Sequence, residues 1–382
     1  MRVLQLGKFY PVKGGVEKVA LSLTEGLAHR GIDCDMLCTY TEGTLGGFSH
    51  EPGPDLSRIV HLCENGRVIC VKSRLTLAKT TFSLRMMRYL RKHAAEYDII
   101  HIHHPDPMAA IALLLSRYKG RVILHWHSDI LSQKVALAIY KPIQNWLIGR
   151  AEKIVGTTPV YLESSPFLKH CPEKHTCIPI GVNPLQYNKE RTDALRAQYV
   201  SDGERLILSI GRLVPYKGYE HLINAMSLLD DSYHLVIGGM GPLQNELQAL
   251  IERLSLSSRV SLAGYVGNHD LANWFHACDV FVLSSVMKTE AFGIVQIEAF
   301  SCGKPVVTSV IEGSGVSWVN ENDVSGINVP SADPKAIADA IMAIFSSPQL
   351  YERYSRGARE RFEKVFTKDK MIDATIKLYE TH

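Results

Sequence analysis

The chain has 382 residues, a length that suggests two domains. Hydrophobic residues make up 46% of it and charged residues 21%, as in an ordinary soluble globular protein. Its eight cysteines form no Cys-x-x-Cys pair, which argues against a zinc knuckle or a disulfide scaffold and favours reduced thiols. The net charge is only +3, but residues 1–190 carry 24 Lys and Arg against 16 Asp and Glu, so the two halves are expected to face different partners.

The first half alternates strand and helix patterns. Residues 2–7 form a short apolar run that ends at a glycine, and apolar residues then recur at helical spacing over 16–27. Further strands are predicted at 34–40, 97–105, 121–127 and 153–159, with a helix at 108–118. Strands that alternate with helices predict parallel βαβ units and hence a doubly wound sheet.

The alternation starts afresh after a polar segment at 188–204. Strands are predicted at 205–211, 234–241, 260–264, 279–285 and 304–309, and helices at 219–229, 243–254, 333–345 and 348–365. We therefore predict an α/β fold of two Rossmann-like, doubly wound parallel-sheet domains, with domain limits of 1–185 and 186–365.

The sequence offers no candidate for a membrane span or a secretory leader. The N-terminal apolar run is too short for a signal peptide, and the longest apolar stretch, Met108 to Leu115, is far below the roughly 20 residues that cross a bilayer. A cytoplasmic protein is expected, with attachment to a membrane surface left open.

Loops that follow strands are the places to seek function, because open parallel sheets bind ligands at the carboxyl ends of their strands. Gly14 and Gly15 lie in such a loop, where the backbone can approach a ligand and the next helix offers unpaired N–H groups. The loop matches neither Gly-x-Gly-x-x-Gly nor the Walker pattern. A tight turn without a ligand is an equally good interpretation of this loop alone.

A second loop of this kind opens the second half. Arg212 directly follows Gly211, and Lys217 comes five positions later, so two cations lie near a strand end. Such a pair suits a diphosphate, because Arg supplies a planar fork of donors and Lys a mobile charge. Solvated charges at a helix start are the alternative, but cations there oppose the helix dipole. Gly239 and Gly241 form a third turn, which would allow close approach to a base or ribose.

Histidines gather at two strand ends of the first half. His-x-His is a conceivable metal pair, but no Cys or carboxylate stands at a recognised zinc spacing, so we predict no metal. His127 is the best candidate to hydrogen-bond a sugar hydroxyl. His101 and His125 are expected in the core. Residues predicted to contact an acceptor are His103, His104 and Asp106.

Two glutamates, Glu290 and Glu298, stand eight positions apart. On one continuous helix they would lie about 12 Å apart along the axis. That exceeds the roughly 5 to 9.5 Å between the carboxylates of glycosidases, so a hydrolytic pair is disfavoured. Gly293 instead suggests that Glu290 precedes a helix and that Glu298 lies on it.

Taken in order, these motifs resemble the retaining glycosyltransferases of the GT-B architecture, and in particular the large family 4, which includes mannosyl- and hexosyltransferases of bacterial polysaccharide and O-antigen synthesis. The resemblance rests on KGGVE, on His127 after its strand, and on GRLVPYKG, GGMGP and EAFGIVQIEAFSCGKPVV. It covers nearly the whole chain.

The resemblance implies two domains facing across a cleft, with the final helix, about residues 366–382, packed back on the acceptor-binding first domain. The nucleotide-sugar would lie against the second domain, with Arg212 and Lys217 on its diphosphate and Glu298 on its ribose. Glu290 would meet the donor sugar. The remaining donor-binding residues implied are Gly14, Gly15, His127, Gly239, Gly241, Ala291, Phe292, Gly293 and Ile294.

The same resemblance implies transfer with retention of anomeric configuration and no metal or other cofactor. The catalytic residues would be His127, Arg212, Lys217 and Glu290. GDP-mannose is favoured over UDP-sugars as donor, the acceptor would be a saccharide or a polyprenyl-linked oligosaccharide, and no nucleic-acid partner is expected.

Residues 73–98 interleave basic and apolar residues, and a basic amphipathic helix is predicted there. Such a helix would attach the protein to the cytoplasmic face of the inner membrane. A surface helix whose apolar side packs on the sheet is the alternative.

Rival functions remain at this stage. A dinucleotide-dependent oxidoreductase would need a Gly-x-Gly-x-x-Gly motif that is absent. A sugar-nucleotide epimerase of the same architecture would need no acceptor, a binding module would show no turnover, and a UDP-hexose-dependent transferase would use another sugar.

Overall fold

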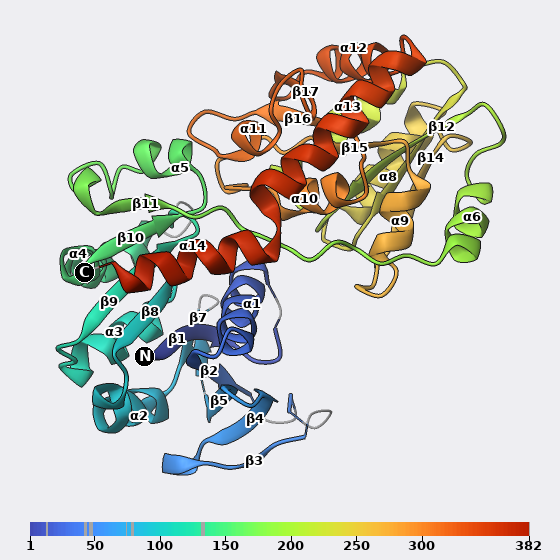
Figure 1. Ribbon diagram of the computed structural model, residues 1–382. Helices are drawn as coiled ribbons and strands as arrows, with labels where there is room; N and C mark the ends of the chain where they lie inside the picture. Colours follow the sequence, from blue (N-terminus) through green and yellow to red (C-terminus); the bar gives the residue numbers. More distant parts are fainter. Residues whose placement is uncertain are drawn as a thin grey trace. The chain divides into compact units, whose positions relative to one another are not determined.

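The computed structural model describes residues 1–12, 14–41, 44–45, 49–73, 75–77, 80–130 and 134–381. The chain divides into two compact units, Met1–Ile180 with Lys368–His382 and Gly181–Thr367 (Figure 1). The observed division between Ile180 and Gly181 lies close to residue 185, where the first domain was predicted to end.

The described strands of the first unit form a nine-stranded sheet in the order β11-β10-β9-β8-β1-β2-β5-β4-β3. The strands from β11 to β5 in this order are parallel, whereas β4 and β3 continue the sheet antiparallel. Their bounds are β1 Arg2–Phe9, β2 Asp33–Tyr40, β3 Glu51–Pro52, β4 Arg58–Cys63, β5 Gly66–Lys72, β8 Ile99–His104, β9 Arg121–Trp126, β10 Lys153–Gly156 and β11 His175–Cys177.

Helices connect these strands, as the alternating pattern predicted. They are α1 Gly15–His29, α2 Leu84–His93, α3 Pro107–Ser116, α4 Lys134–Arg150, α5 Pro159–Ser164 and α14 Lys368–Glu380, with short 3-10 turns η1 Pro54–Leu56, η2 Ala94–Glu96 and η3 Pro172–Lys174. The start of α3 shows the local cause of a boundary: Asp106 accepts a hydrogen bond from the Ala109 amide, and proline occupies the first helical position.

The last helix, α14, belongs to the first unit. It packs against α1, and Arg30 forms ion pairs with Asp369 at 2.9 Å and Asp373 at 2.7 Å. The C-terminal end of the chain therefore completes the same face of the first sheet that the N-terminal helix covers.

The predicted helix over 73–98 is wrong in its first part. The chain there forms a two-stranded ribbon, β6 Leu75–Leu77 and β7 Thr80–Phe82, and α2 begins only at Leu84, where Ser83 accepts a hydrogen bond from the Met86 amide. The β-branched run at Thr80 and Thr81 favours a strand, and the serine is a strong helix N-cap. Arg74 and Lys79 of the predicted helix lie outside the described residues.

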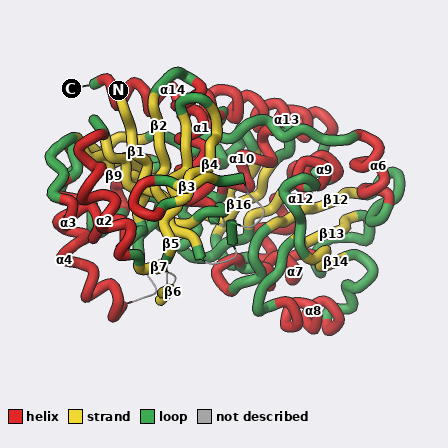
Figure 2. The backbone as a smooth tube through the Cα atoms, turned by 90° about the horizontal axis from the view of Figure 1, so that it is seen from below, coloured by secondary structure: helices red, strands yellow, loops and turns green. Residues whose placement is uncertain are grey.

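The second unit is a six-stranded sheet of the described strands in the order β14-β13-β12-β15-β16-β17, all parallel. The regular alternation of strands and helices can be followed in Figure 2. The strands are β12 Arg205–Ile210, β13 Tyr233–Gly238, β14 Val260–Gly264, β15 Val280–Leu283, β16 Val306–Val310 and β17 Gly326–Pro330. The helices are α6 Lys189–Ala197, α7 Tyr219–Met226, α8 Gln244–Arg253, α9 Leu271–Ala277, α10 Ile294–Ser301, α11 Val316–Val319, α12 Pro334–Ile344 and α13 Pro348–Arg361, with η4 Pro215–Lys217 and the π-helical turn η5 Phe362–Phe366.

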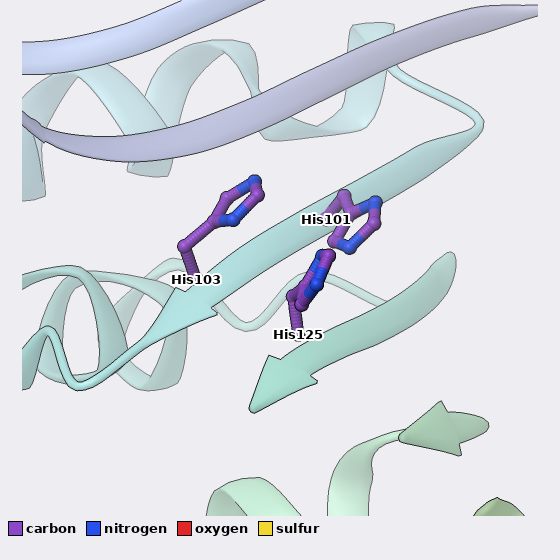
Figure 3. A group of neighbouring side chains, drawn as sticks. All are labelled: His101, His103 and His125. Carbon is purple, nitrogen blue, oxygen red and sulfur yellow. The ribbon is translucent and has the colours of Figure 1, made fainter. Parts of the chain in front are cut away.

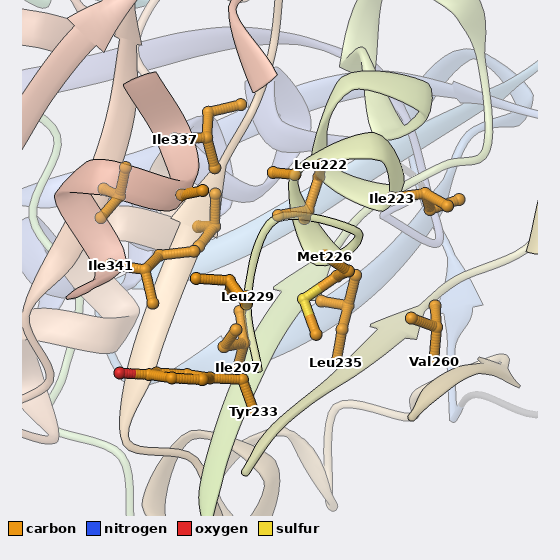
Figure 4. Packing of buried hydrophobic residues seen from close by; sticks show 14 of the residues in the cluster. Ile207, Leu222, Ile223, Met226, Leu229, Tyr233, Leu235, Val260, Ile337 and Ile341 are labelled. Carbon is orange, nitrogen blue, oxygen red and sulfur yellow. The ribbon is translucent and has the colours of Figure 1, made fainter. Parts of the chain in front are cut away.

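A hydrophobic core holds the second sheet to its helices (Figure 4). Leu222 and Met226 of α7, Leu235 of β13 and Ile341 of α12 belong to one cluster and are almost fully buried. Because α7 and α12 are anchored in this way, the loops at the carboxyl ends of the strands project from a rigid base.

Candidate functional site

The strand order of the second unit indicates at which edge of the sheet a ligand would bind. The order corresponds to 3-2-1-4-5-6, which reverses direction between β12 and β15. Ligands of open α/β sheets bind outside the carboxyl ends of the strands at such a reversal. The loops that leave β12 and β15 carry Arg212, Lys217 and Glu290, three of the residues predicted from the sequence.

Lys217 and Glu290 meet at this reversal. The Lys217 Nζ atom lies 2.5 Å from Glu290 Oε2, and the two side chains keep only 9% and 13% of their surface exposed. Ser285, in the loop directly after β15, donates a hydrogen bond from Oγ to the same carboxylate oxygen at 3.1 Å. One carboxylate is thus held by a cation and a hydroxyl, and it is fixed in position before any ligand arrives.

Backbone contacts tie the two loops together. The Val286 amide donates to the Tyr216 carbonyl at 2.8 Å, and the Ser284 hydroxyl donates to the Lys217 carbonyl at 3.0 Å. The Ser314 hydroxyl donates to the Glu290 carbonyl. The serines at 285 and 314 were not predicted as site residues, although Ser285 belongs to the polar end of a predicted strand, the position that could have signalled it.

Gly211 makes room for this arrangement. A Cβ atom at Gly211 would lie 2.8 Å from the Tyr219 hydroxyl and 3.1 Å from Lys217 Cε. Tyr219 is almost fully buried, and burial, together with the nearby Glu290, raises the pKa of its hydroxyl above the ordinary range. Arg212, by contrast, is exposed and forms no ion pair with any described residue, so its guanidinium is available to an anion.

Gly239 and Gly241 have a structural role that the sequence did not reveal. A Cβ atom at Gly239 would come within 1.8 Å of the Gly211 carbonyl oxygen, and one at Gly241 within 2.3 Å of the Leu213 carbonyl oxygen. The Gly211 amide also donates to the Gly238 carbonyl at 2.9 Å. These glycines let the loop after β13 pack on the loop that carries Arg212 and Lys217. Their contact with a base or ribose stays a prediction.

The start of α10 carries unpaired backbone donors. Gly293 takes a left-handed conformation, with φ of 73°, directly before the helix. Within the described chain, the amides of Ala291, Phe292, Gly293 and Ile294 donate to no residue. Together with the helix dipole they form a cradle suited to an anion. As Gly293 predicted, Glu290 lies in the preceding loop and Glu298 on the helix, where it is buried.

The predicted residues of the first unit lie at the corresponding edge of its sheet. Gly14 caps α1 without a side chain, and Gly15 is the first helical residue; both are exposed. A Cβ atom at Gly14 would lie 2.6 Å from the Glu17 carboxylate. His127 directly follows β9, as expected.

Four histidines stack on one face of this sheet. His101 and His103 project from β8 and His125 from β9 (Figure 3), and His127 continues the series. Ring centroids lie 5.0 Å apart for His101 and His103, 5.2 Å for His103 and His127, and 4.2 Å for His125 and His127. Alternate residues of a strand share a face, which is why the spacing of two brings these rings together.

Burial keeps these histidines neutral. Desolvation lowers the pKa of His101 to about 3 and holds the pKa values of His103, His125 and His127 well below their usual range, with the neighbouring imidazoles adding to the effect. His101 has a partner in the Tyr379 hydroxyl at 2.5 Å, as expected of a core histidine. His125 does not, because both of its ring nitrogens are buried without a hydrogen bond to any described residue.

The histidine cluster is poorly arranged to bind a metal ion. His101, His103 and His125 bring one nitrogen each within 4.8 Å of one another. The rings of His101 and His103 are stacked and nearly parallel, at 7°, so their nitrogen lone pairs lie in separate parallel planes and do not converge on one point. His103 also has both nitrogens engaged, with His127 and Gln5 at 2.9 Å each.

The three residues predicted to contact an acceptor are all buried and already have protein partners. His103 bonds Gln5 and His127, Asp106 caps α3, and His104 stacks on Trp126 with ring centroids 3.8 Å apart. Burial raises the pKa of Asp106 to about 6. Acceptor contact stays a prediction for these residues.

Comparison with known proteins assigns the two units to known families. The profile described as Glycosyl transferases group 1 matches residues 191–361, and that described as Glycosyltransferase Family 4 matches residues 13–185. The chain is 32% identical to an O-antigen chain mannosyltransferase of Escherichia coli, over all of this chain and 98% of that protein. It is also 32% identical to a D-rhamnosyltransferase of Pseudomonas aeruginosa, over 96% of this chain and 92% of that protein.

Solved structures share the fold. A sucrose-phosphate synthase of Thermosynechococcus elongatus has a TM-score of 0.76 and 21% identity, covering 99% of this chain and 98% of that one. The Anabaena protein HepE, in complex with UDP and glucose, also has a TM-score of 0.76, at 19% identity over all of both chains. The chain therefore belongs to glycosyltransferase family 4 and is a glycosyltransferase built from two Rossmann-like domains of the GT-B fold.

Proposed function

We propose that this enzyme transfers a hexose, with mannose favoured, from a nucleotide-sugar to a saccharide or a lipid-linked saccharide, with retention of anomeric configuration. Two relatives of similar length are named as an O-antigen chain mannosyltransferase and a D-rhamnosyltransferase, which supports a role in cell-surface polysaccharide synthesis. GDP-mannose is the favoured donor, and UDP-hexoses are the alternative.

The observation that carries the proposal is the cluster of charge and backbone donors at the reversal point of the second sheet. Arg212 is exposed there, Lys217 is held by Glu290 at 2.5 Å, and four amides at residues 291–294 have no partner in the described chain. Cations and free amides are the groups that bind a diphosphate. We assign the diphosphate to Arg212, Lys217 and the amides.

The other parts of the donor follow from this placement. Glu290 lies beside the free amides of residues 291–294 and would bind hydroxyls of the transferred sugar. Glu298, one helical turn after Ile294 on α10, would bind the ribose. For the first unit, we propose that His127, Gly14 and Gly15 contact the donor.

The proposed reaction needs no covalent nucleophile from the protein. The bond between the anomeric carbon and the diphosphate oxygen breaks, a bond from the acceptor hydroxyl oxygen forms on the same face, and the hydroxyl proton passes to the departing diphosphate. Lys217, Arg212 and the amides stabilise the negative charge that develops on the leaving group. Positioning of donor and acceptor supplies the remaining rate enhancement.

Release of nucleoside diphosphate tests this function. We expect release only when a saccharide acceptor is added, fastest with GDP-mannose, unchanged by a metal chelator, and with an α-linked product from an α-linked donor. Thermal unfolding in the presence of each nucleotide-sugar ranks the donors, because a ligand at 100 times its Kd stabilises by about 2.7 kcal/mol. Release without acceptor would indicate a hydrolysing epimerase, and binding without turnover a binding module.

We also propose that the first unit attaches to an anionic membrane through a basic surface around α2. The apolar face of α2 is not available, because Met86, Tyr89 and Leu90 are buried. Three leucines on or beside α2 are exposed instead: Leu84, its first residue, by 81%, Leu56 by 71% and Leu115 by 50%. The same surface carries Arg85, Arg88, Arg91 and Arg117, which line two pockets of about 250 and 520 Å³. No helix of the described chain is both long and apolar enough to cross a bilayer.

Sedimentation with anionic vesicles tests this attachment. Arg91 is exposed and forms no ion pair with a described residue, so Arg91→Ala should weaken binding about fivefold at low salt, the effect of roughly 1 kcal/mol per basic residue. Arg253→Ala removes another exposed charge, from the second unit, and should leave binding unchanged. Absence of wild-type sedimentation at low salt would contradict the proposal.

A further inference from the structure

A continuous series of hydrogen bonds links the last helix of the chain to His127. The Gln5 side chain, on β1, lies at its centre, with Nε2 3.0 Å from the Tyr379 hydroxyl and Oε1 2.9 Å from His103 Nε2. His103 Nδ1 lies 2.9 Å from His127 Nε2, and the Tyr379 hydroxyl lies 2.5 Å from His101 Nδ1. All five side chains are buried, and they come from α14, β1, β8 and the end of β9.

The donor and acceptor capacity of each group gives the series a direction. The Gln5 amide oxygen carries no proton, so the proton between it and His103 must sit on His103 Nε2. Burial lowers the pKa of His103, and a neutral imidazole has a single N–H, so its Nδ1 must accept. His127 Nε2 is therefore the donor in the next bond. Because burial keeps His127 neutral as well, its Nδ1 has no proton.

Tyr379 couples the orientation of the Gln5 amide to His101. In the observed orientation its hydroxyl accepts the proton of Gln5 Nε2 and donates its own proton to His101 Nδ1, so His101 carries its proton on Nε2, which is buried without a partner in the described chain. If the amide were reversed, its N–H group would face His103, and every proton in the series would move to the opposite nitrogen. His127 would then carry its proton on Nδ1.

We propose that Gln5 and Tyr379 are positioning residues that hold His127 in the Nε2-protonated form, so that its Nδ1 lone pair is presented to a sugar hydroxyl. The fixed tautomer is a property of the protein alone, whereas its use in sugar binding rests on the proposed function. His127 Nδ1 makes no hydrogen bond to a described residue, and 6% of the residue's surface remains exposed. An unprotonated nitrogen accepts from a hydroxyl and repels the oxygens of a phosphate, so it selects the sugar end of the donor or an acceptor hydroxyl.

The tautomer can be read directly by long-range proton–nitrogen NMR of protein labelled with ¹⁵N-histidine, without any ligand. We expect His127 to carry its proton on Nε2 and to show an unprotonated Nδ1. A proton on Nδ1 of His127 would overturn the proposal.

Tyr379→Phe removes the hydroxyl that couples the Gln5 amide to His101 and keeps the aromatic ring. We expect the ratio of the two His127 tautomers to shift about tenfold toward the Nδ1-protonated form, which corresponds to the free energy of one lost hydrogen bond. The same free energy predicts that kcat/KM for the donor falls about three- to tenfold. Tyr118→Phe is the matched control, because it removes a hydroxyl that bonds the Tyr97 and Asp98 carbonyls in the same unit.

The two parts of the proposal fail in different ways. An unchanged tautomer ratio in folded Tyr379→Phe would overturn the hydrogen-bond series. A shifted ratio with unchanged kinetics would overturn the contact between His127 and the sugar, which belongs to the proposed function. If Tyr379→Phe does not fold, the wild-type spectrum still decides whether the predicted tautomer exists.

Discussion

Lys217→Ala and Glu290→Ala are each expected to lower the rate of sugar transfer more than tenfold. Lys217→Ala removes the cation that would stabilise the departing diphosphate, and Glu290→Ala removes the carboxylate that would bind the transferred sugar. Each single variant also leaves a buried charge without its partner, which costs about 3–5 kcal/mol of folding stability. Initial rates and thermal unfolding measured on the same preparations give both effects.

The double variant Lys217→Ala with Glu290→Ala separates catalysis from stability. It leaves no unpaired charge, so we expect it to be more stable than either single variant and just as inactive. Arg196→Ala is the matched control: Arg196 pairs with Asp279 at 3.0 Å, beside the opposite ends of β12 and β15. Recovery of transfer in the double variant would mean that the pair only stabilises the loops, and wild-type rates in a single variant would remove that residue from the active site.

Gly239→Ala is expected to destabilise the second unit by about 3 kcal/mol or more and to abolish donor binding. The new Cβ atom would stand 1.8 Å from the Gly211 carbonyl oxygen, and the φ of 143° is a conformation that alanine rarely adopts. Overpacking costs about 1–3 kcal/mol and the backbone strain about 1–2 kcal/mol more. Because the displaced loop carries Arg212 and Lys217, these two cations should no longer be in position to bind the diphosphate.

Calorimetry measures this effect as a fall of roughly 6–12 °C in the Tm of the second unit. Gly264→Ala controls for backbone strain alone, since Gly264 has a φ of 71° but no atom within 4 Å of the place where the new Cβ would stand. We expect it to cost about 1–2 kcal/mol and to keep donor binding. Equal effects of the two substitutions would show that the contact with Gly211 is not what requires a glycine at 239.

Local patterns predicted much of the fold and part of the site. The change from a period of two to a period of 3.6 is a property of neighbouring residues, and it located most of the parallel strands of both sheets, although β5, β11 and β17 were not predicted. Gly293 likewise indicated a break before a helix, because only glycine adopts a left-handed conformation at no cost, and α10 does begin directly after it.

The prediction that failed needed contacts that local patterns do not contain. The basic residues of 73–98 suggested one long helix, but the chain forms β6, β7 and then α2, whose apolar side packs into the unit. Local patterns also gave no sign that Gly239 and Gly241 pack on the carbonyls of Gly211 and Leu213, and their predicted contact with a ligand stays a prediction. In both cases the atoms that decide the local structure belong to another part of the fold.

The sequence by itself therefore determined the alternation of strands and helices in two domains, the loops that carry charge, and the family to which they belong, because these depend on residue type and spacing. Only the tertiary structure decided which side chains meet. Lys217 and Glu290 are 73 residues apart, and Gln5 and Tyr379 are 374 apart. A hydrogen bond acts over about 3 Å, so its partners become known only when the sheets bring distant strands and helices together.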